Sequence, residues 1–96
     1  MSNPVEGSDY TIILQADESL VGATVTILYR KPDGTKVEDV TPTNVDTGTN
    51  EISYKIESTD SVEGIWAIQA KVVNSSGYIS YTKPVATVTF DRELQV

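Results

Sequence analysis

The sequence predicts an all-β fold, an antiparallel β-sandwich of about seven strands built around one core. Val, Ile, Thr and Tyr, which favour strands, are abundant along the chain. Apolar and polar residues alternate at period two in run after run, and no stretch of a dozen residues keeps the apolar spacing of a helix. Turn-forming residues separate these short runs. The length of 96 residues fits a single domain.

The first half of the chain contains three expected strands. The first covers residues 10–15 and the second covers residues 23–30. Residues 31–34, with the sequence Lys-Pro-Asp-Gly, are typical of a tight turn and join the second strand to residues 35–40 as a hairpin. Residues 42–50 begin with Pro and are rich in Thr, Asn, Asp and Gly, which indicates a loop or a poorly paired edge.

The second half contains four more expected strands, at residues 51–57, 65–74, 78–82 and 85–90. Pro84 breaks the chain between the last two and suits an edge or a bend. One-faced alternation is typical of antiparallel sheets whose other face meets water. The side chains that it turns toward the core are Tyr10, Ile12, Leu14, Ala23, Val25, Ile27, Tyr29, Ile52, Tyr54, Ile56, Trp66, Ile68, Ala70, Val72, Ala86, Val88 and Phe90.

Trp66 is the largest apolar side chain in the sequence. It shares a face of its strand with Ile68 and Ala70, so we expect it to fill the space between the two sheets. The alternative is an exposed indole that stacks on a sugar or a base, which requires the ring to point outward.

The composition excludes several classes of function. Seven basic and fourteen acidic residues give a net charge of −7, which opposes binding to nucleic acid and to anionic membranes. The chain has no Cys and no His, so it offers neither a thiol nucleophile nor a Ser-His-Asp triad, and no ordinary zinc or iron site. The sequence predicts no transmembrane helix and no secretory signal. We therefore expect a protein that is not an enzyme and has no catalytic residues, no metal and no cofactor.

Carboxylates are the remaining candidates for chemistry. Glu38 and Asp39, like Glu57 and Asp60, are interpreted as solvated loop residues, because a small sandwich has little room for a deep cleft. Residues 44–51 place oxygen-bearing side chains at alternating positions, faintly like a calcium loop. They lack the clustered Asp residues of such a loop, so a polar loop is the default interpretation and weak calcium binding is the alternative.

The segment Val62-Glu63-Gly64-Ile65-Trp66-Ala67-Ile68 resembles the penultimate core strand of the immunoglobulin-like superfamily. That strand commonly carries Asp-x-Gly/Ala-x-Tyr-x-Cys. Here Gly64 and an aromatic residue, Trp66, are kept, while Ile68 replaces the Cys. The resemblance implies an immunoglobulin-like β-sandwich without its disulfide and without antibody-type function.

A narrower resemblance covers most of the chain. The matching residues are Leu20, Gly22, Ala23, Thr24, Val25, Tyr29, Arg30, Lys31, Pro32, Asp33, Gly34, Thr35, Ile52, Tyr54, Ile56, Gly64, Trp66, Gln69 and Ala70. In this order they look like small immunoglobulin-like structural proteins of tailed bacteriophages, and they are similar to the N-terminal domain of phage baseplate upper proteins.

The resemblance implies a virion structural protein assembled in the host cytoplasm. A capsid decoration or cement role is the first expectation, and a tail, baseplate or head–tail accessory of the same fold is the alternative. The implied partner is a larger viral assembly, through its major capsid protein or a tail or baseplate protein, with self-association on the particle as a further possibility. A carbohydrate-binding or adhesion module is the competing class of function.

The partner contacts are expected at the ends of the molecule. We divide the chain into an N-terminal arm (1–8), a sandwich (9–91) and a C-terminal arm (92–96), and expect the arms to lie along a neighbour's sheet edge. The alternative is frayed termini. Exposed Tyr is favoured in protein contacts, although tyrosines can also simply cover the rim of the sandwich. The candidate partner-binding residues are Asn3, Pro4, Val5, Tyr78, Tyr81, Leu94 and Val96.

Overall fold

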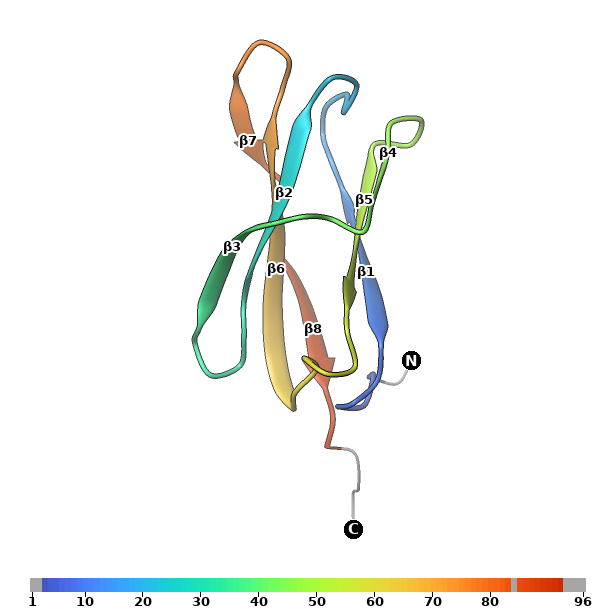
Figure 1. The fold of residues 1–96 in the computed structure, drawn as a ribbon, viewed down its shortest axis with the longest axis vertical. Helices are drawn as coiled ribbons and strands as arrows, with labels where there is room; N and C mark the ends of the chain where they lie inside the picture. Colours follow the sequence, from blue (N-terminus) through green and yellow to red (C-terminus); the bar gives the residue numbers. More distant parts are fainter. Residues whose placement is uncertain (1–2, 84, 93–96) are drawn as a thin grey trace.

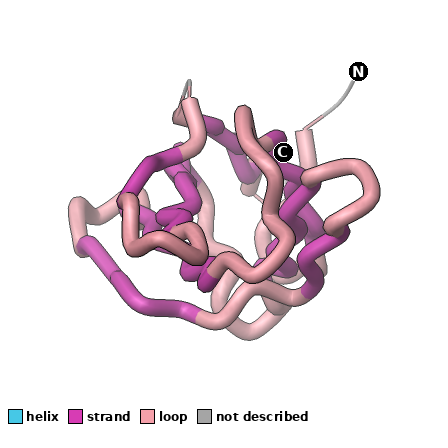
Figure 2. The backbone as a smooth tube through the Cα atoms, turned by 90° about the horizontal axis from the view of Figure 1, so that it is seen from above, coloured by secondary structure: helices cyan, strands magenta, loops and turns pink. Residues whose placement is uncertain are grey.

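The computed structural model describes residues 3–83 and 85–92, and every regular element among them is a strand. Seen from above, the described backbone consists only of strands and loops (Figure 2). The strands are β1 (Tyr10–Gln15), β2 (Thr24–Arg30), β3 (Lys36–Val40), β4 (Asn44–Asp46), β5 (Glu51–Ile56), β6 (Gly64–Val73), β7 (Ile79–Tyr81) and β8 (Ala86–Phe90). The all-β prediction is confirmed.

The strands form two antiparallel sheets that pack face to face along the long axis of the molecule (Figure 1). One sheet has the order β1-β5-β4. The other has the order β3-β2-β6-β7, and β8 also pairs with β6. Immunoglobulin-type sandwiches likewise divide their strands between two antiparallel sheets packed face to face. The predicted β-sandwich is therefore the architecture that these residues adopt.

Most of the core consists of the side chains that the alternation pattern turned inward, and Ala16 and Leu20, which lie outside the alternating runs, complete it. Ile27, Ile52 and Ile68 are completely buried, and the other predicted core residues are buried or partly buried. Trp66 is 1% exposed, and its indole N–H donates to the Val62 carbonyl at 3.3 Å. The prediction that this ring fills the space between the sheets is confirmed.

Four further aromatic rings in the core form a connected series of contacts with the Trp66 indole. Tyr29 lies 5.3 Å from Trp66 and 5.8 Å from Tyr54, and Phe90 lies 6.1 Å from both Trp66 and Tyr10, between ring centroids. Such pairs add to the stability gained from burial alone. The rings come from both sheets, so they connect the two layers.

The one strand beyond the seven expected is β4, which lies in the segment that the sequence indicated as a loop or a poorly paired edge. It is three residues long and pairs only with β5. The turn that follows is closed by Asp46, whose Oδ1 accepts from the backbone N–H groups of Gly48 and Thr49 at 2.9 and 3.2 Å. Such side-chain bonds stabilise a turn locally. This carboxylate therefore has a structural task in its own loop.

The long strand β6 pairs with β2 along one edge and with two shorter strands, β7 and β8, along the other. β8 pairs with its first half and β7 with its last three residues. Between them Thr82 takes the place of a strand residue: its N–H donates to the Ala70 carbonyl at 2.9 Å, and its hydroxyl accepts from the Ala70 N–H at 3.0 Å. Pro84, which the sequence placed at an edge or a bend, lies outside the described residues.

The N-terminal segment differs from the free arm that the sequence suggested. Val5 forms a parallel bridge with Asp91, whose N–H donates to the Pro4 carbonyl and whose carbonyl accepts from the Glu6 N–H. The Gly7 N–H also lies within hydrogen-bonding distance of Ser61. Described residues 4–7 therefore extend the edge of β8 within this chain, because they satisfy backbone groups that would otherwise be unpaired.

Candidate protein-binding surface

Nine large apolar side chains are exposed in the described part of the chain. They are Val5, Ile13, Val21, Val62, Ile65, Tyr78, Ile79, Tyr81 and Val85. Scattered exposed apolar residues are normal, but a group of them on one face marks an interaction site. Four of these nine lie on the outer side of the five-stranded sheet, distributed along β6 from Ile65 near its start to Ile79, which pairs with its last residue, Val73.

The even-numbered residues of β6 from Trp66 to Val72 are buried, so the odd-numbered residues point to the outer face of that sheet. Ile65 is one of these and is 62% exposed. Ile79 and Tyr81 pair with odd-numbered residues of β6, and Val85 precedes the inward-facing Ala86, so all three lie on the same side. We define the outer face as the solvent-facing side of the five-stranded sheet, centred on Leu28, Ile65, Ala67, Gln69, Ile79, Tyr81 and Val85.

The outer face is hollowed at two places. One depression of about 230 Å³ is lined by Leu28, Ala67, Gln69 and Val85, together with residues of β2 and β3. The second, of about 120 Å³, lies between Leu28 and Tyr81. Both are shallow concavities beside apolar side chains, which suits the side chains of a protein partner better than a small molecule that must be enclosed.

Charged residues of both signs line these depressions. Arg30 and Lys36 line the larger one, and Lys71 lines the smaller one together with Glu38 and Asp39. Lys36 is paired with Glu38 at 3.1 Å, and both side chains are about half exposed, so this ion pair contributes little to stability. An apolar centre with a polar and charged rim is typical of protein interfaces, in which Arg and Tyr are enriched.

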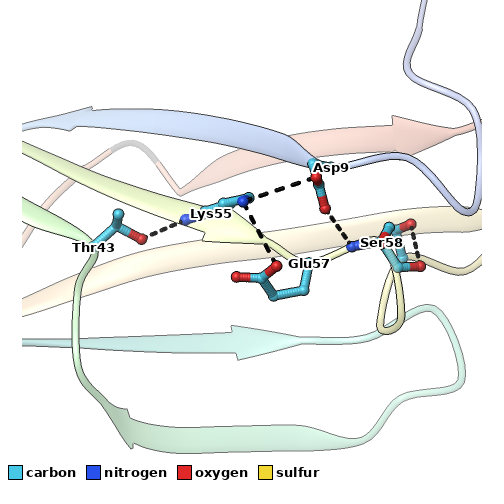
Figure 3. A network of polar contacts seen from close by, with 6 residues as sticks. Asp9, Thr43, Lys55, Glu57 and Ser58 are labelled. Atoms are coloured by element: carbon cyan, nitrogen blue, oxygen red, sulfur yellow. Dashed lines mark hydrogen bonds and ion pairs between the residues drawn. The ribbon is translucent and has the colours of Figure 1, made fainter.

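The three-stranded sheet has the opposite character. Its most prominent charged group is a network at one end, in which the Lys55 ammonium lies 3.8 Å from Asp9 and 3.7 Å from Glu57 (Figure 3). Asp9 also accepts from the Ser58 N–H at 2.7 Å, and the Lys55 N–H donates to the Thr43 hydroxyl at 2.8 Å (Figure 3). These contacts connect β1, β5 and two loops, which gives the carboxylates structural partners.

The two predicted tyrosines are both exposed, Tyr78 at 59% and Tyr81 at 48%. Both line a hollow beside the connection that follows β1, and Tyr81 also lies on the outer face. Tyr78 follows the hairpin turn at Gly77. The expectation of exposed tyrosines at this end of the molecule is confirmed, whereas their use in a contact stays a prediction.

The candidate residues in the terminal segments are placed only in part. Pro4 and Val5 are engaged with Asp91 of the same chain, and the Asn3 amide lies 3.4 Å from the Asp91 carboxylate. Leu94 and Val96 lie outside the described residues. The described N-terminal residues therefore offer a neighbour only their outward side chains, since their backbone groups are already partly paired.

Sequence analysis missed Leu28, Ile65, Ala67 and Val85 as members of one surface. Each is an apolar residue at an outward position, where the alternation of its strand would place a polar residue. This mismatch is the sequence signal that could have identified them. The register between strands, which no single run reveals, brings them together.

The described residues contain no group of three acidic, His or Cys side chains placed to hold a metal ion. The Thr35 N–H donates to the Asp33 carboxylate at 2.9 Å and holds the pKa of that carboxyl below its usual value. This is a turn contact at the surface. No described helix is long and apolar enough to cross a membrane.

Comparisons with protein families, with curated proteins and with solved structures find no match to this chain.

Proposed function

We propose that the protein is a non-enzymatic structural protein of a bacteriophage virion, which attaches to a larger protein assembly through its outer face. Within that class a capsid decoration or cement role is the first proposal, and a tail, baseplate or head–tail accessory is the second. The proposal rests on the sequence resemblance for the particle and on the outer face for the contact.

The observation that carries the contact is that four exposed apolar residues lie on the outer side of one sheet. Ile65, Ile79, Tyr81 and Val85 are each between 48% and 62% exposed, and Val85 and Tyr81 each line one of the two depressions. Burying such side chains in a complex releases roughly 25 cal/mol for each Å² of apolar surface removed from water. On a symmetric particle many copies bind at once, so a modest contact for each copy suffices.

The competing adhesion function has lost its main candidate residue. Trp66 is buried in the core and offers no ring face to a sugar. Glycan stacking would have to use Tyr78 or Tyr81, which are exposed and line one hollow of about 250 Å³. The outer face, with its mixed apolar and charged lining, favours a protein partner.

The test uses particles of the phage that encodes the chain, prepared with the gene deleted. Purified protein is added back, heads and tails are separated, and the bound protein is measured by co-sedimentation. Wild-type protein should sediment with one of the two fractions. The double variant Ile79→Ser/Tyr81→Ser should bind at least tenfold more weakly, because it removes two apolar contacts of the outer face.

Val62→Ser provides the matched control, since Val62 is similarly exposed at 46% but lies in the loop before β6. It should bind like the wild type. Protein that sediments with neither fraction refutes the virion role. Full binding by the double variant would leave the virion role standing and refute the outer face as the contact.

A further inference from the structure

The first strand of the three-stranded sheet leaves one edge open. β1 pairs with β5 on one side, and nothing in the described ranges pairs with its other side. The Ala16 N–H donates to the Asn50 carbonyl next to β5, and backbone groups of a strand alternate between its two sides. The even-numbered residues of β1 therefore bond to β5. The N–H and C=O groups of Thr11, Ile13 and Gln15 point to the open edge.

Proteins usually protect such edges with charge, proline, bulges, short strands or a covering segment. The other described edges follow this rule: β3 carries Lys36 and Glu38 and an irregular register, and β4 and β7 have three residues each. Residues 4–6 cover the end of β8. β1 has six residues without a charge, a proline or a bulge, and Ile13 on it is 61% exposed.

The open edge lies beside a hollow on the same flank of the sandwich. At the start of β1 the ring of Tyr10 contacts Phe90 of β8, with the ring centroids 6.1 Å apart. Just beyond its end the Glu18 carboxylate accepts from the Ser80 hydroxyl of β7 at 3.0 Å. The hollow, of about 250 Å³, opens there, with Ala16–Glu18 on one side and Val72 and Tyr78–Lys83 on the other. An added strand on β1 would direct alternate side chains toward this flank.

The charges around β1 decide what kind of strand fits. Asp17 and Glu18 follow the strand, and Glu51 is paired with its last residue. Asp9 precedes the strand and shares Lys55 with Glu57. Lys83 is the one cation that lines the hollow in the described part of the chain. Both ends of the edge are therefore acidic on balance.

A second copy of the chain is a poor occupant for this edge. In an antiparallel pair of β1 strands centred on Ile13, Asp9 of each copy would face Asp17 of the other, and like charges at opposed positions destabilise a sheet. The net charge of −7 on each copy adds to this repulsion.

We propose that the open edge of β1 binds an extended segment of a partner protein, which joins the three-stranded sheet as an added strand. The segment is uncharged at its centre, carries a basic residue at each end and places an apolar side chain at the hollow beside Ala16. Its backbone pairs with Thr11, Ile13 and Gln15. The strand pairing takes place on the other sheet from the outer face, and the two surfaces meet at the hollow, which Ile79 and Tyr81 also line.

The test measures amide hydrogen exchange by NMR on the full chain. In the free protein the amides of Thr11, Ile13 and Gln15 should exchange rapidly, and those of Ile12 and Leu14 slowly. The probe is a blocked peptide, Lys-Val-Thr-Val-Thr-Val-Lys. It should slow exchange at the three edge amides at least tenfold, and it should bind at least tenfold more tightly than the same peptide with Glu at both ends.

Two variants at one position separate edge pairing from side-chain contact. Ile13→Pro removes the edge-facing N–H, which has no partner within the described chain, so the fold should tolerate it while peptide binding is lost. Ile13→Thr keeps that N–H and should keep binding within threefold. Should Ile13→Pro prove unfolded, the exchange measurements on the wild type still decide the matter.

Several results would overturn the proposal. Slow exchange of the three edge amides in the free protein would mean that the edge is already covered. Protection that rises with protein concentration alone would make a second copy the occupant. Protection by the peptide at Thr87 and Thr89 of β8, or at no amide, would show that β1 is not the acceptor.

Discussion

Two features require a glycine at position 64: its backbone conformation and the close approach of Pro32. Gly64 starts β6 with a φ of +122°, a conformation that side chains rarely adopt. A Cβ added there would lie 2.5 Å from Pro32 Cβ and 2.9 Å from Pro32 Cγ, in the turn between β2 and β3. Gly64→Ala therefore introduces backbone strain and a steric overlap together.

The two costs can be separated. Strain at such a φ costs about 1–3 kcal/mol, and an overlap in a packed contact costs a further 1–3 kcal/mol, roughly. Gly34→Ala and Gly77→Ala are the matched controls, because both glycines have positive φ and a Cβ would meet nothing within 4 Å. They should show the strain alone. Each kcal/mol lowers the melting temperature of a domain of this size by about 4–8 °C.

A double-mutant cycle isolates the overlap. Pro32→Gly removes both atoms that the new methyl group would strike and leaves Pro32 Cα, at 3.9 Å, as the nearest atom. Combining it with Gly64→Ala should recover about 1–3 kcal/mol relative to the sum of the single changes, measured by urea denaturation. Simple additivity, with Gly64→Ala melting like Gly34→Ala, would refute the close packing of this turn on β6.

The other predictions concern three separate parts of the sandwich. Thr82→Val should destabilise the fold by about 1–3 kcal/mol, because it leaves the buried Ala70 N–H without an acceptor, whereas Thr82→Ser should retain most of the stability in the same denaturation assay. Burial, with the nearby Tyr29, raises the pKa of Tyr54 from 10.0 to about 12, so this group's contribution to stability is complete below pH 10 and is lost as the pH rises toward 12. A phenolate absorbance titration of Tyr54→Phe should lack the last ionisation. Deleting residues 1–8 should cost about 1–3 kcal/mol, since it removes the backbone bonds to Asp91, and an unchanged melting temperature would contradict this docking.

Most of the fold could be predicted because alternation is a local signal. Each inward residue of β6, from Trp66 to Val72, follows from the period-two pattern alone, since a strand that is covered on one face must alternate. The turn at residues 31–34 was equally accessible, because Pro and Gly restrict the backbone directly. β4 was harder to predict, since its three residues are held mainly by pairing with β5 and have little pattern of their own.

The candidate surfaces depend on which strands become neighbours, and so they could be predicted only in part. Exposed tyrosines at the end near β7 followed from their place beside a turn. Ile65 and Val85 are about twenty residues apart in the sequence and share a face only because β8 pairs with the first half of β6. An apolar residue at an outward position marks a candidate, but its neighbours on the surface follow from sheet order.

The N-terminal segment shows why edges matter for function in this fold. Residues 4–6 pair with Asp91 at the end of β8, so that edge has a partner within the chain. Within the described residues β1 keeps an open edge along its six residues. The expectation that the arm lies along a neighbour's sheet edge stays a prediction. The proposed strand addition uses β1 because that edge, unlike the end of β8, has backbone groups without a partner in the described part of the chain.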